Sequence, residues 1–273
     1  LFVIISFTKS FSQIPPPVVE DITVCDGEST LIVPMADEGN EGGQPIPIAS
    51  QNFDDEGLGF TPSIIFNDGA NDHFGPTDGC NISNVSGDYS FQTANCDDEV
   101  PNGNIFWAAE DVDDAGGNGE NPQSIVFDPV NISNFTNIQF CFDMAAGNEN
   151  LPGSNQYDLL DYVDVLYNLD GNGNTEGICF NYQDNCDAFN EPLYSDPNCD
   201  GDVSDGVLLS TTAQQFCFTL PVAETTGATN VIFTIEVAMG SSSEEIAFDN
   251  IEILGEEASS NFTFNFYDDN PDM

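Results

Sequence analysis

The sequence predicts an all-β protein built as a sandwich of two sheets, and three observations support this fold class. Many short segments alternate apolar and polar residues, which is the pattern of a strand with one buried face. The segments between them are rich in Gly, Asn, Asp and Pro, which favour turns and loops. No stretch has a long helical period. Many short strands joined by turn residues are typical of β-sandwiches and jelly rolls.

The composition restricts the partners that the protein can have. Its 273 residues include 48 acidic side chains and a single basic one, Lys9, which gives a formal charge of −47. Hydrophobic residues make up 40% of the chain, too much for a disordered acidic tail and enough for one large core. Because almost nothing can neutralise phosphate, the composition argues against nucleic acid and anionic membrane surfaces as partners. Clustered carboxylates at this charge favour bound counter-ions, above all Ca²⁺.

The eight cysteines predict disulfide bonds and an oxidising, extracellular compartment. No CxxC pair occurs, and the single histidine, His73, cannot complete a Cys/His zinc site. The full connectivity stays open, but short separations favour Cys80–Cys96 and Cys186–Cys199. Cys141 and Cys217 lie in similar strands, each on the side opposite the phenylalanines, and are predicted to bridge neighbouring strands.

The chain begins with an apolar segment, Leu1–Phe7, and two interpretations of residues 1–14 stay open. They are the end of a secretory signal peptide cut near Gln13, or an ordered strand that is donated to a neighbour. Residues 15–45 form a Pro-rich spacer, a short β segment and a Gly-rich linker. The β segment, VVEDITVCDGESTLIVP, resembles the opening of the Ig-like repeats of large bacterial surface adhesins.

The main domain is predicted over residues 46–255. Before its last two strands, the strand candidates in chain order are Ser63–Phe66, Asp88–Gln92, Asn104–Ala109, Ser124–Asp128, Asn137–Met144, Asp161–Leu169, Gly177–Tyr182 and Gln215–Leu220. Alternate residues are apolar in two of them, which places these residues on one face of each strand: Ile138, Phe140, Phe142 and Met144, then Phe216, Phe218 and Leu220.

The last two strands, within Thr229–Leu254, organise the domain. Alternate residues of the first strand share an apolar face, namely Val231, Phe233, Ile235, Val237 and Met239. In the second strand, Asp249 and Asn250 interrupt an apolar run. A buried carboxylate costs free energy unless something pairs with it, and this chain has almost no cation to offer. We therefore expect a bound metal ion beside Asp249.

Several motifs in this order resemble MAM-type jelly-roll domains, and still more the acidic jelly-roll modules of secreted bacterial surface proteins. The motifs are NFDDEG, a Gly-Asp-Tyr strand, SIVFDPVNISNFTNIQFCFDMA, DYVDVLYNLDG, FCFTLPV and the closing IAFDNIEI. The resemblance covers about Ala49–Gly255 and implies a jelly-roll fold. It also implies a metal ion shared by Asp54 and Asp249. The chain departs from this pattern in a Cys-rich insertion from Cys179 to Gly206 and in its lack of basic residues.

Other acidic loops are also candidate Ca²⁺ sites, since Asp, Asn and Gly provide the oxygen ligands that this ion prefers. Asp111 and Asp113, which follow the aromatic strand NIFWAAE, rank next after Asp54 and Asp249. The loop at Asp170 opens like an EF-hand loop but lacks the central glycine and the final glutamate of that motif. For each single cluster, a solvated acidic loop stays the alternative.

Five Asn-X-Ser/Thr sequons predict covalent glycans, at Asn81, Asn84, Asn131, Asn134 and Asn261. Four of them form the adjacent doublets NISNVS and NISNFT, although so short a motif also arises by chance in an Asn-rich chain.

The C-terminal residues 256–273 are predicted to form a polar linker and a strand. In this strand, NFTFNFY, the side chains of Phe262, Phe264 and Phe266 lie on one face. A strand with an apolar face needs a sheet to pair with. It either folds back onto its own domain or enters a groove on the next subunit.

These features predict a secreted structural protein, a Ca²⁺-stabilised jelly-roll subunit of an extracellular filament assembled by strand donation. The chain would then be its own partner in a head-to-tail homopolymer, and in this respect it resembles the protomers of environmental extracellular glycofibrils. The alternative is a carbohydrate-binding or adhesin module of a larger cell-surface protein, with an exposed aromatic platform near Trp107 or Tyr157. Trp107 shares a strand face with Ile105 and Ala109, however, which favours a core position. No catalytic motif is present, and we expect no enzyme.

Overall fold

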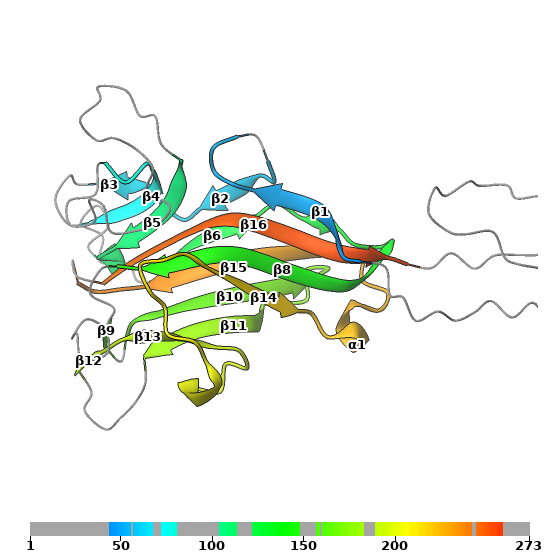
Figure 1. The fold of residues 1–273 in the computed structure, drawn as a ribbon. Helices are drawn as coiled ribbons and strands as arrows, with labels where there is room; N and C mark the ends of the chain where they lie inside the picture. Colours follow the sequence, from blue (N-terminus) through cyan, green and yellow to red (C-terminus); the bar gives the residue numbers. More distant parts are fainter. Residues whose placement is uncertain are drawn as a thin grey trace, which may run out of the picture. The chain divides into compact units, whose positions relative to one another are not determined.

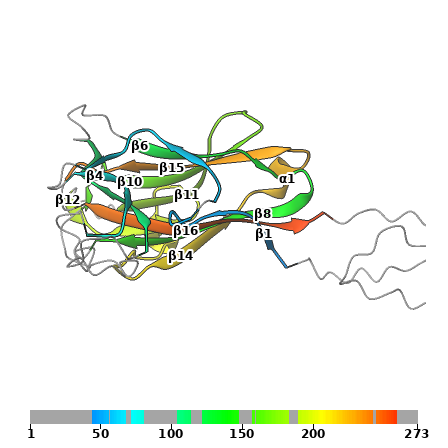
Figure 2. The same cartoon turned by 90° about the horizontal axis from the view of Figure 1, so that it is seen from above.

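The computed structural model contains two antiparallel seven-stranded sheets that pack face to face (Figures 1 and 2). The structure describes residues 44–55, 57–67, 72–80, 104–113, 122–147, 157–158, 160–182, 189–241 and 244–258. Contacts group Pro45–Glu257 as one unit. The all-β sandwich predicted from the sequence is confirmed, and the described residues form a single short α-helix, α1 (Val222–Thr225).

Sheet A is built around two long strands. Its order is β14 (Gln214–Thr219), β8 (Phe135–Ala146), β16 (Glu245–Glu257), β5 (Phe106–Glu110), β4 (His73–Thr77) and β3 (Phe66–Asn67), and β1 (Ile46–Gln51) also pairs with β16. β16 therefore has neighbours on both sides, with β8 on one side and with β1 and β5 in succession on the other.

Sheet B lies against sheet A. Its order is β13 (Leu193–Asp196), β11 (Thr175–Tyr182), β10 (Tyr162–Leu169), β15 (Asn230–Ala238), β6 (Gln123–Phe127) and β2 (Phe60–Pro62), and β7 (Val130–Asn131) also pairs with β15. A separate two-stranded sheet joins β9 (Tyr157–Asp158) and β12 (Phe189–Glu191).

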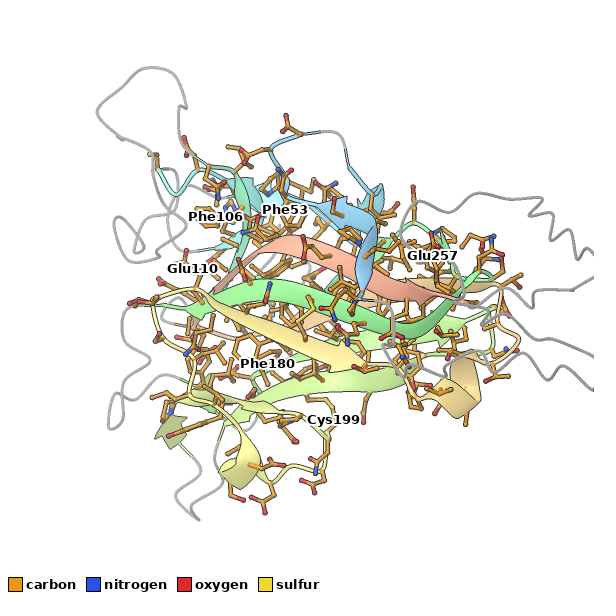
Figure 3. The ribbon with its side chains drawn as sticks, turned by 45° about the vertical axis from the view of Figure 1, so that its right-hand side comes forward. Phe53, Phe106, Glu110, Phe180, Cys199 and Glu257 are labelled. Atoms are coloured by element: carbon orange, nitrogen blue, oxygen red, sulfur yellow. A yellow bond between two sulfur atoms is a disulfide. The ribbon has the colours of Figure 1, made fainter. Side chains whose placement is uncertain are left out.

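The core lies between the sheets and follows the predicted alternation. All five apolar residues predicted for the first strand in Thr229–Leu254 are fully buried, four of them on β15 and Met239 directly after its end. The four alternating residues of β8 are fully buried as well. Phe180 of β11, which lies in the same sheet as β15, is part of this core as well (Figure 3). Each such side chain stabilises the fold by about 1.5–3 kcal/mol through removal of its surface from water. Trp107 is also fully buried, which confirms its core position.

One predicted strand, Ser63–Phe66, is wrong. At this point the chain leaves one sheet for the other: β2 pairs with β6 in sheet B, and β3 pairs with β4 in sheet A. Ser63 lies outside both strands, and its hydroxyl donates to Gln123 Oε1 at 2.7 Å. β4 was not predicted because its sequence, HFGPT, contains the turn residues Gly75 and Pro76.

Two disulfides are present among the described residues. Cys141–Cys217 is confirmed, since these cysteines face each other in the register of β8 and β14. The predicted pair Cys186–Cys199 is wrong: Cys199 bonds to Cys179. The reason is that Cys179 pairs with Asp196 across β11 and β13, so the loop after Asp196 brings Cys199 back to Cys179. Cys80 is also disulfide-bonded, and its predicted partner, Cys96, lies outside the described residues.

Several predicted segments lie outside the described residues. They are the apolar N-terminal segment, the β segment within residues 15–45, the strand Asp88–Gln92 and the C-terminal strand NFTFNFY. No helix among the described residues is long and apolar enough to cross a membrane.

Candidate metal centre and ligand-binding face

A turn after β1 positions Asp54. The Gln51 side chain, which is buried, holds this turn at both ends: its amide donates to the Leu58 carbonyl at 2.8 Å, and its oxygen accepts from the Phe53 amide at 2.7 Å. The Phe53 ring packs on Trp107 with the ring centroids 5.7 Å apart. With Phe53 anchored in the core, the next residue, Asp54, points back to the sandwich and accepts a hydrogen bond from the Ile105 amide at 2.8 Å.

Asp54 lies near enough to Asp249 for its charge to act on the Asp249 carboxylate, and these are the two residues for which the resemblance implies a shared metal ion. Asn104, the neighbour of Ile105, donates to Asp249 Oδ2 at 2.8 Å. On the other side of Asp249 lies Asp143, its register partner on β8. A bulge follows directly in β16, where Asn250 has a φ of 50° and donates to Asp143 Oδ2 at 2.9 Å. We call Asp54, Asn104, Asp143 and Asp249 the Asp249 cluster.

The cluster contains an unsatisfied buried atom. Asp249 is 1% exposed, and its Oδ1 has no hydrogen-bond partner. The net pKa of Asp249 is raised to about 6. Burial is the main cause and the charges of Asp54 and Asp143 act in the same direction, whereas hydrogen bonds from the Asn104 side chain and the Asn250 amide oppose them. Carboxylate and amide oxygens are the ligands of hard cations such as Ca²⁺, so the donor set fits the predicted ion.

Asp111 and Asp113 are not part of the Asp249 cluster. They follow the end of β5, whereas Asn104 precedes its start. Asp111 has a φ of 45°, and the Asp113 amide donates to the Met239 carbonyl at 3.3 Å, at the end of β15. The structure thus separates the two predicted metal pairs by the length of a strand.

The outer face of sheet B carries a pocket that sequence reasoning missed. Tyr162 and Asp164 of β10 alternate with the fully buried Val163 and Val165, so they lie on the face opposite the core. Together with residues of β11 and of the loop after β13 they form what we call the open-face pocket, lined by Tyr162, Asp164, Glu176, Cys179, Asn181, Cys199, Asp200 and Gly201. The alternation of β10 gave a signal for this face, but the loop that completes it follows only from the Cys179–Cys199 bond.

Negative charge concentrates at the open-face pocket. The pKa of Asp164 is raised to about 6, mainly by burial and in addition by the nearby charges of Glu176, Glu236 and Asp196. The Tyr162 hydroxyl donates to Glu236 Oε1 at 3.1 Å. Burial and the Glu236 charge both raise the pKa of Tyr162, so this hydroxyl stays a hydrogen-bond donor at neutral pH.

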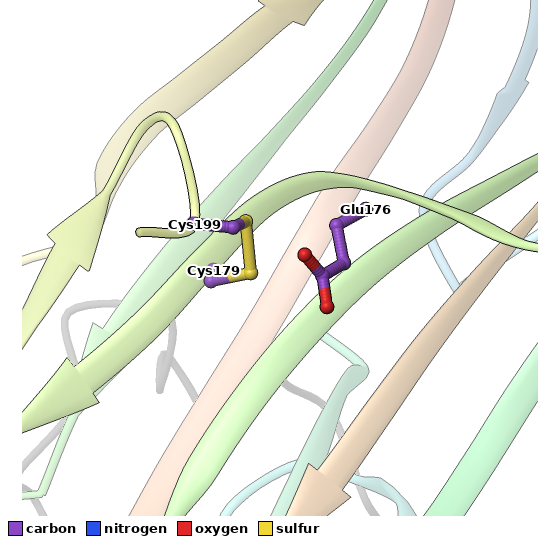
Figure 4. Close-up of side chains that lie close together, drawn as sticks. All are labelled: Glu176, Cys179 and Cys199. Atoms are coloured by element: carbon purple, nitrogen blue, oxygen red, sulfur yellow. A yellow bond between two sulfur atoms is a disulfide. The ribbon is translucent and has the colours of Figure 1, made fainter. Parts of the chain in front are cut away.

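The Cys179–Cys199 disulfide shapes one wall of the pocket. Glu176 lies close to both sulfur atoms (Figure 4). These sulfurs are not available as metal ligands, because the thiolate is the form that binds metal and both are in a disulfide. Cys199 and Gly201 both have positive φ angles, of 54° and 82°, which tightens the loop at the rim.

A further pair of carboxylates is buried at one end of sheet B. Asp161 and Glu244 are 3% and 4% exposed, and their side chains form a hydrogen bond with each other. The Gly240 amide donates to Glu244 Oε2 at 2.7 Å. Burial, followed by the charge of Asp161, raises the pKa of Glu244 to about 9, so the pair holds a proton at neutral pH.

The Asp170 loop has a structural role. Asp170 accepts hydrogen bonds from the Thr229 and Asn230 amides and from the Thr229 hydroxyl, at 2.9–3.2 Å. These bonds lower the pKa of Asp170. These bonds join the loop after β10 to the start of β15, so the Asp170 carboxylate is satisfied by hydrogen bonds within the protein.

The aromatic platform expected near Trp107 or Tyr157 is wrong. Trp107 is fully buried, and Tyr157 is 1% exposed with its hydroxyl donating to the Glu245 carbonyl at 2.7 Å. Two predicted glycosylation sites, Asn131 and Asn134, are exposed, and Asn131 Oδ1 accepts from the Ser133 amide. The other sequons, at Asn81, Asn84 and Asn261, lie outside the described residues.

Comparisons with known proteins find likenesses among solved structures alone. No family model matches the chain, and no curated protein does. The chain is similar to the K3 cleaved adhesin domain of Lys-gingipain from Porphyromonas gingivalis W83, at 11% identity over 77% of this chain and 98% of that one, with a TM-score of 0.36. It is similar to TmCBM27, a carbohydrate-binding module with specific mannan recognition, at 9% identity over 78% and 99% of the two chains, with a TM-score of 0.32. The chain is also similar to a family 11 carbohydrate-binding module from Clostridium thermocellum, in complex with a β-1,3-1,4-mixed-linked tetrasaccharide. The identity is 12% over 78% of this chain and 99% of that one, with a TM-score of 0.29.

Proposed function

We propose that this protein is an extracellular, Ca²⁺-stabilised β-sandwich module that binds polyhydroxylated ligands, in the manner of a carbohydrate-binding or adhesin module. The observation that supports a ligand-binding role is the open-face pocket. There an ordered sheet presents Tyr162, Asp164 and Asn181 in a recess on its solvent face. Small-molecule sites are concave and contain a few well-placed polar groups on a rigid scaffold.

The chemistry of this recess suits sugar hydroxyl groups. A hydroxyl group can both donate and accept hydrogen bonds, so it can bind a carboxylate and an amide side by side. Tyr162 adds an amphipathic ring beside them. Anionic ligands are disfavoured, because Asp164, Glu176 and Glu236 repel them and the chain has no arginine to compensate. The proposal contains no catalytic step.

A Ca²⁺ ion at the Asp249 cluster would stabilise the module. Asp54 and Asp249 would hold it, with Asp143 and Asn104 beside them, and it would neutralise the carboxylate that the fold buries. This role is structural, because the cluster connects the turn after β1, the start of β5 and the bulge of β16.

The test is binding of purified protein to an array of neutral polysaccharides in the presence of Ca²⁺. We expect Tyr162→Ala to weaken binding by about ten-fold, which corresponds to about 1.4 kcal/mol. Val126→Ala serves as the control, since Val126 is exposed on sheet B but does not line the pocket. A wild-type protein that binds no polysaccharide, or a Tyr162→Ala variant that binds as the wild type does, contradicts the proposal.

Filament assembly by strand donation is the second candidate function. It is favoured by the apolar alternation of Phe262, Phe264 and Phe266 and by the apolar segment Leu1–Phe7. An extended segment of this kind can complete the sheet of a neighbouring subunit and build an open fibre. Electron microscopy of the secreted protein tests it: deletion of the donor segment should leave monomers, and fibres that persist without residues 1–14 and 259–273, a deletion that keeps β16 whole, would exclude it.

A further inference from the structure

We propose that the outer edge of β14 is an acceptor for strand addition, and that its occupant is the segment Asn261–Tyr267 of a second copy of this chain. This inference goes beyond the proposed ligand binding, since β14 belongs to sheet A and none of its residues lines the open-face pocket. It rests on filament assembly, the second candidate function, and specifies the surface to which the donated strand binds.

The backbone of β14 offers hydrogen-bonding groups to a further strand. β14 ends sheet A, and among the described residues it pairs with β8 alone (Figure 1). Cys141 and Cys217 face each other with their Cα atoms 4.1 Å apart, which is the spacing of a pair that exchanges no backbone hydrogen bonds. The N–H and C=O groups of Cys217, and by alternation those of Gln215 and Thr219, therefore point away from β8. The Leu220 amide, one residue on, donates to a β8 carbonyl at 2.8 Å, as this alternation requires.

The other edges of the two large sheets are protected by devices that hinder strand addition. β1 contains Pro47 and β2 ends with Pro62, while β3 has two residues. The edge of β13 is covered, because the Leu209 amide donates to the Leu193 carbonyl at 3.0 Å. Within the part of the chain that the structure describes, β14 is therefore the longest edge strand without a proline or a covering segment.

The segment Asn261–Tyr267, NFTFNFY, matches this edge in length and charge. It has seven residues against six in β14, QQFCFT, and neither sequence contains a charged side chain although the chain has 48 acidic residues. Like charges on facing strands are destabilising. In so acidic a protein, a neutral edge is therefore the favourable place for a neutral segment to pair.

The alternation of the two sequences matches as well. Phe216 and Phe218 of β14 pack on the core, and the residues between them are exposed on the outer face of sheet A. Phe218 is only half-buried. A strand added beside it can place Phe262, Phe264 and Phe266 in the same inner layer, with its polar residues outside. Cross-strand aromatic pairs stabilise such an arrangement.

The occupant belongs to a second copy, because the segment of the same chain cannot lie along the whole of β14. β16 ends at Glu257, which pairs with Phe135, whereas the last residue of β14, Thr219, pairs with Gln139. A strand beyond β14 therefore begins about 13 Å back along the strands and about 14 Å to the side, or about 20 Å from Glu257. The chain from Glu257 to Asn261 spans about 14 Å at most. Pairing of one copy's C-terminal segment with the next copy's β14 repeats head to tail.

Assembly of the full chain in Ca²⁺, measured by sedimentation velocity, tests the acceptor. Gln215→Pro removes an N–H that points away from β8, a change that edge strands tolerate. It should raise the dissociation constant of assembly at least about ten-fold, because the donor strand loses a hydrogen-bond partner and meets the proline ring. Gln215→Ala keeps the N–H and is the matched control.

A charge on the same edge gives a second test at an exposed side chain. Thr219→Glu places a carboxylate beside the donor strand and should weaken assembly as Gln215→Pro does. Thr61→Glu adds the same charge at an exposed threonine of β2, on the edge of sheet B, and should assemble as the wild type does.

A mixing experiment separates donor from acceptor. Phe262→Ser, Phe264→Ser and Phe266→Ser combined remove the apolar face of the donor and leave β14 unchanged. This triple variant and Gln215→Pro should each stay monomeric. An equimolar mixture should form heterodimers rather than fibres, because it contains one intact donor and one intact acceptor.

Assembly of Thr219→Glu to the same extent as Thr61→Glu refutes the β14 acceptor, whether or not Gln215→Pro folds. If the triple serine variant is monomeric in that case, strand donation stands and its acceptor lies elsewhere. A wild type that stays monomeric, or fibres that persist without both terminal segments, overturns strand donation as well. Polysaccharide binding should be equal in Gln215→Ala and wild type, so the proposed ligand binding is judged independently of these outcomes.

Discussion

The Asp249 cluster and the Asp161–Glu244 pair are both buried groups of carboxylates, yet they differ in how the charge can be neutralised. Asp161 and Glu244 bond to each other, so a shared proton satisfies them. Asp249 bonds to Asn104 through one oxygen and leaves the other without a donor. Where the described residues contain neither Lys nor Arg, a buried acid can be accommodated in two ways: it can retain a proton, or it can provide oxygens for an external ion.

Removal of Ca²⁺ should change the stability of the protein most, and it should act through the Asp249 cluster. If the free Ca²⁺ concentration is about 1,000 times the dissociation constant of the Asp249 cluster, chelation lowers the free energy of unfolding by about 4 kcal/mol. Thermal unfolding with and without EDTA measures this effect. Asp249→Asn should be less stable than wild type in Ca²⁺ and should lose little more on chelation. A wild-type melting curve that EDTA does not change would refute the stabilising ion.

A change in pH should reveal the contribution of the Asp161–Glu244 pair to stability. The pKa of Glu244 is about 9 in the folded protein against 4.5 ordinarily, so the folded state binds more protons than the unfolded state between these values. Stability conferred by this proton is therefore complete below pH 4.5 and is lost as the pH rises toward 9, by at most about 1.4 kcal/mol per pH unit. Asp158 and Asp161 face the same group and strengthen the trend.

Glu244→Gln isolates this contribution, because an amide keeps the hydrogen bonds without ionising. Urea unfolding in EDTA at several pH values should show a flatter profile for this variant than for wild type between pH 6 and about 9. Asp205→Asn, at an exposed position, is the control. Equal slopes in the variant and the wild type would contradict the shared proton.

Loss of the Asn104 amide should have a moderate effect that depends on the ion. Asn104→Ala removes the donor to Asp249 Oδ2 and should cost about 1–3 kcal/mol in EDTA, the usual penalty for a buried group left without its partner. With Ca²⁺ bound the cost should be smaller, because the ion satisfies the carboxylate. An identical loss in both conditions, measured by thermal unfolding, would separate Asn104 from the metal centre.

Asp170→Asn should have the smallest effect and should be independent of Ca²⁺. Asp170 is satisfied by hydrogen bonds from Thr229 and Asn230, so this exposed carboxylate needs neither a proton nor an ion. The melting temperature should fall slightly and equally with and without EDTA. A loss that appears only with Ca²⁺ would make the Asp170 loop a metal site after all.

Local pattern was sufficient to predict the sandwich, whereas the association of Asp54 with Asp249 was implied only by the resemblance to jelly-roll modules. Strict alternation in β8 and β15 determines which residues face the core, and burial of Asp249 follows from its place in an apolar strand. The open-face pocket could not be predicted in the same way. It depends on the register of β10, β11 and β13 and on the pairing of Cys199 with Cys179, and neither local propensity nor sequence separation determines these long-range pairings.

The place of β16 in sheet A has a consequence for how the chain folds. β16 pairs with β1, 200 or more residues earlier: Ile46 with Gly255 and Gln51 with Ile251. It also separates β8 from β5 and β1, so sheet A cannot close until this strand has been synthesised. Contacts between such distant segments slow folding, because the entropy of closing a long loop must be overcome first. Sheet A of the nascent chain therefore stays incomplete until Glu257 has left the ribosome, so its final assembly falls after synthesis of nearly the whole domain.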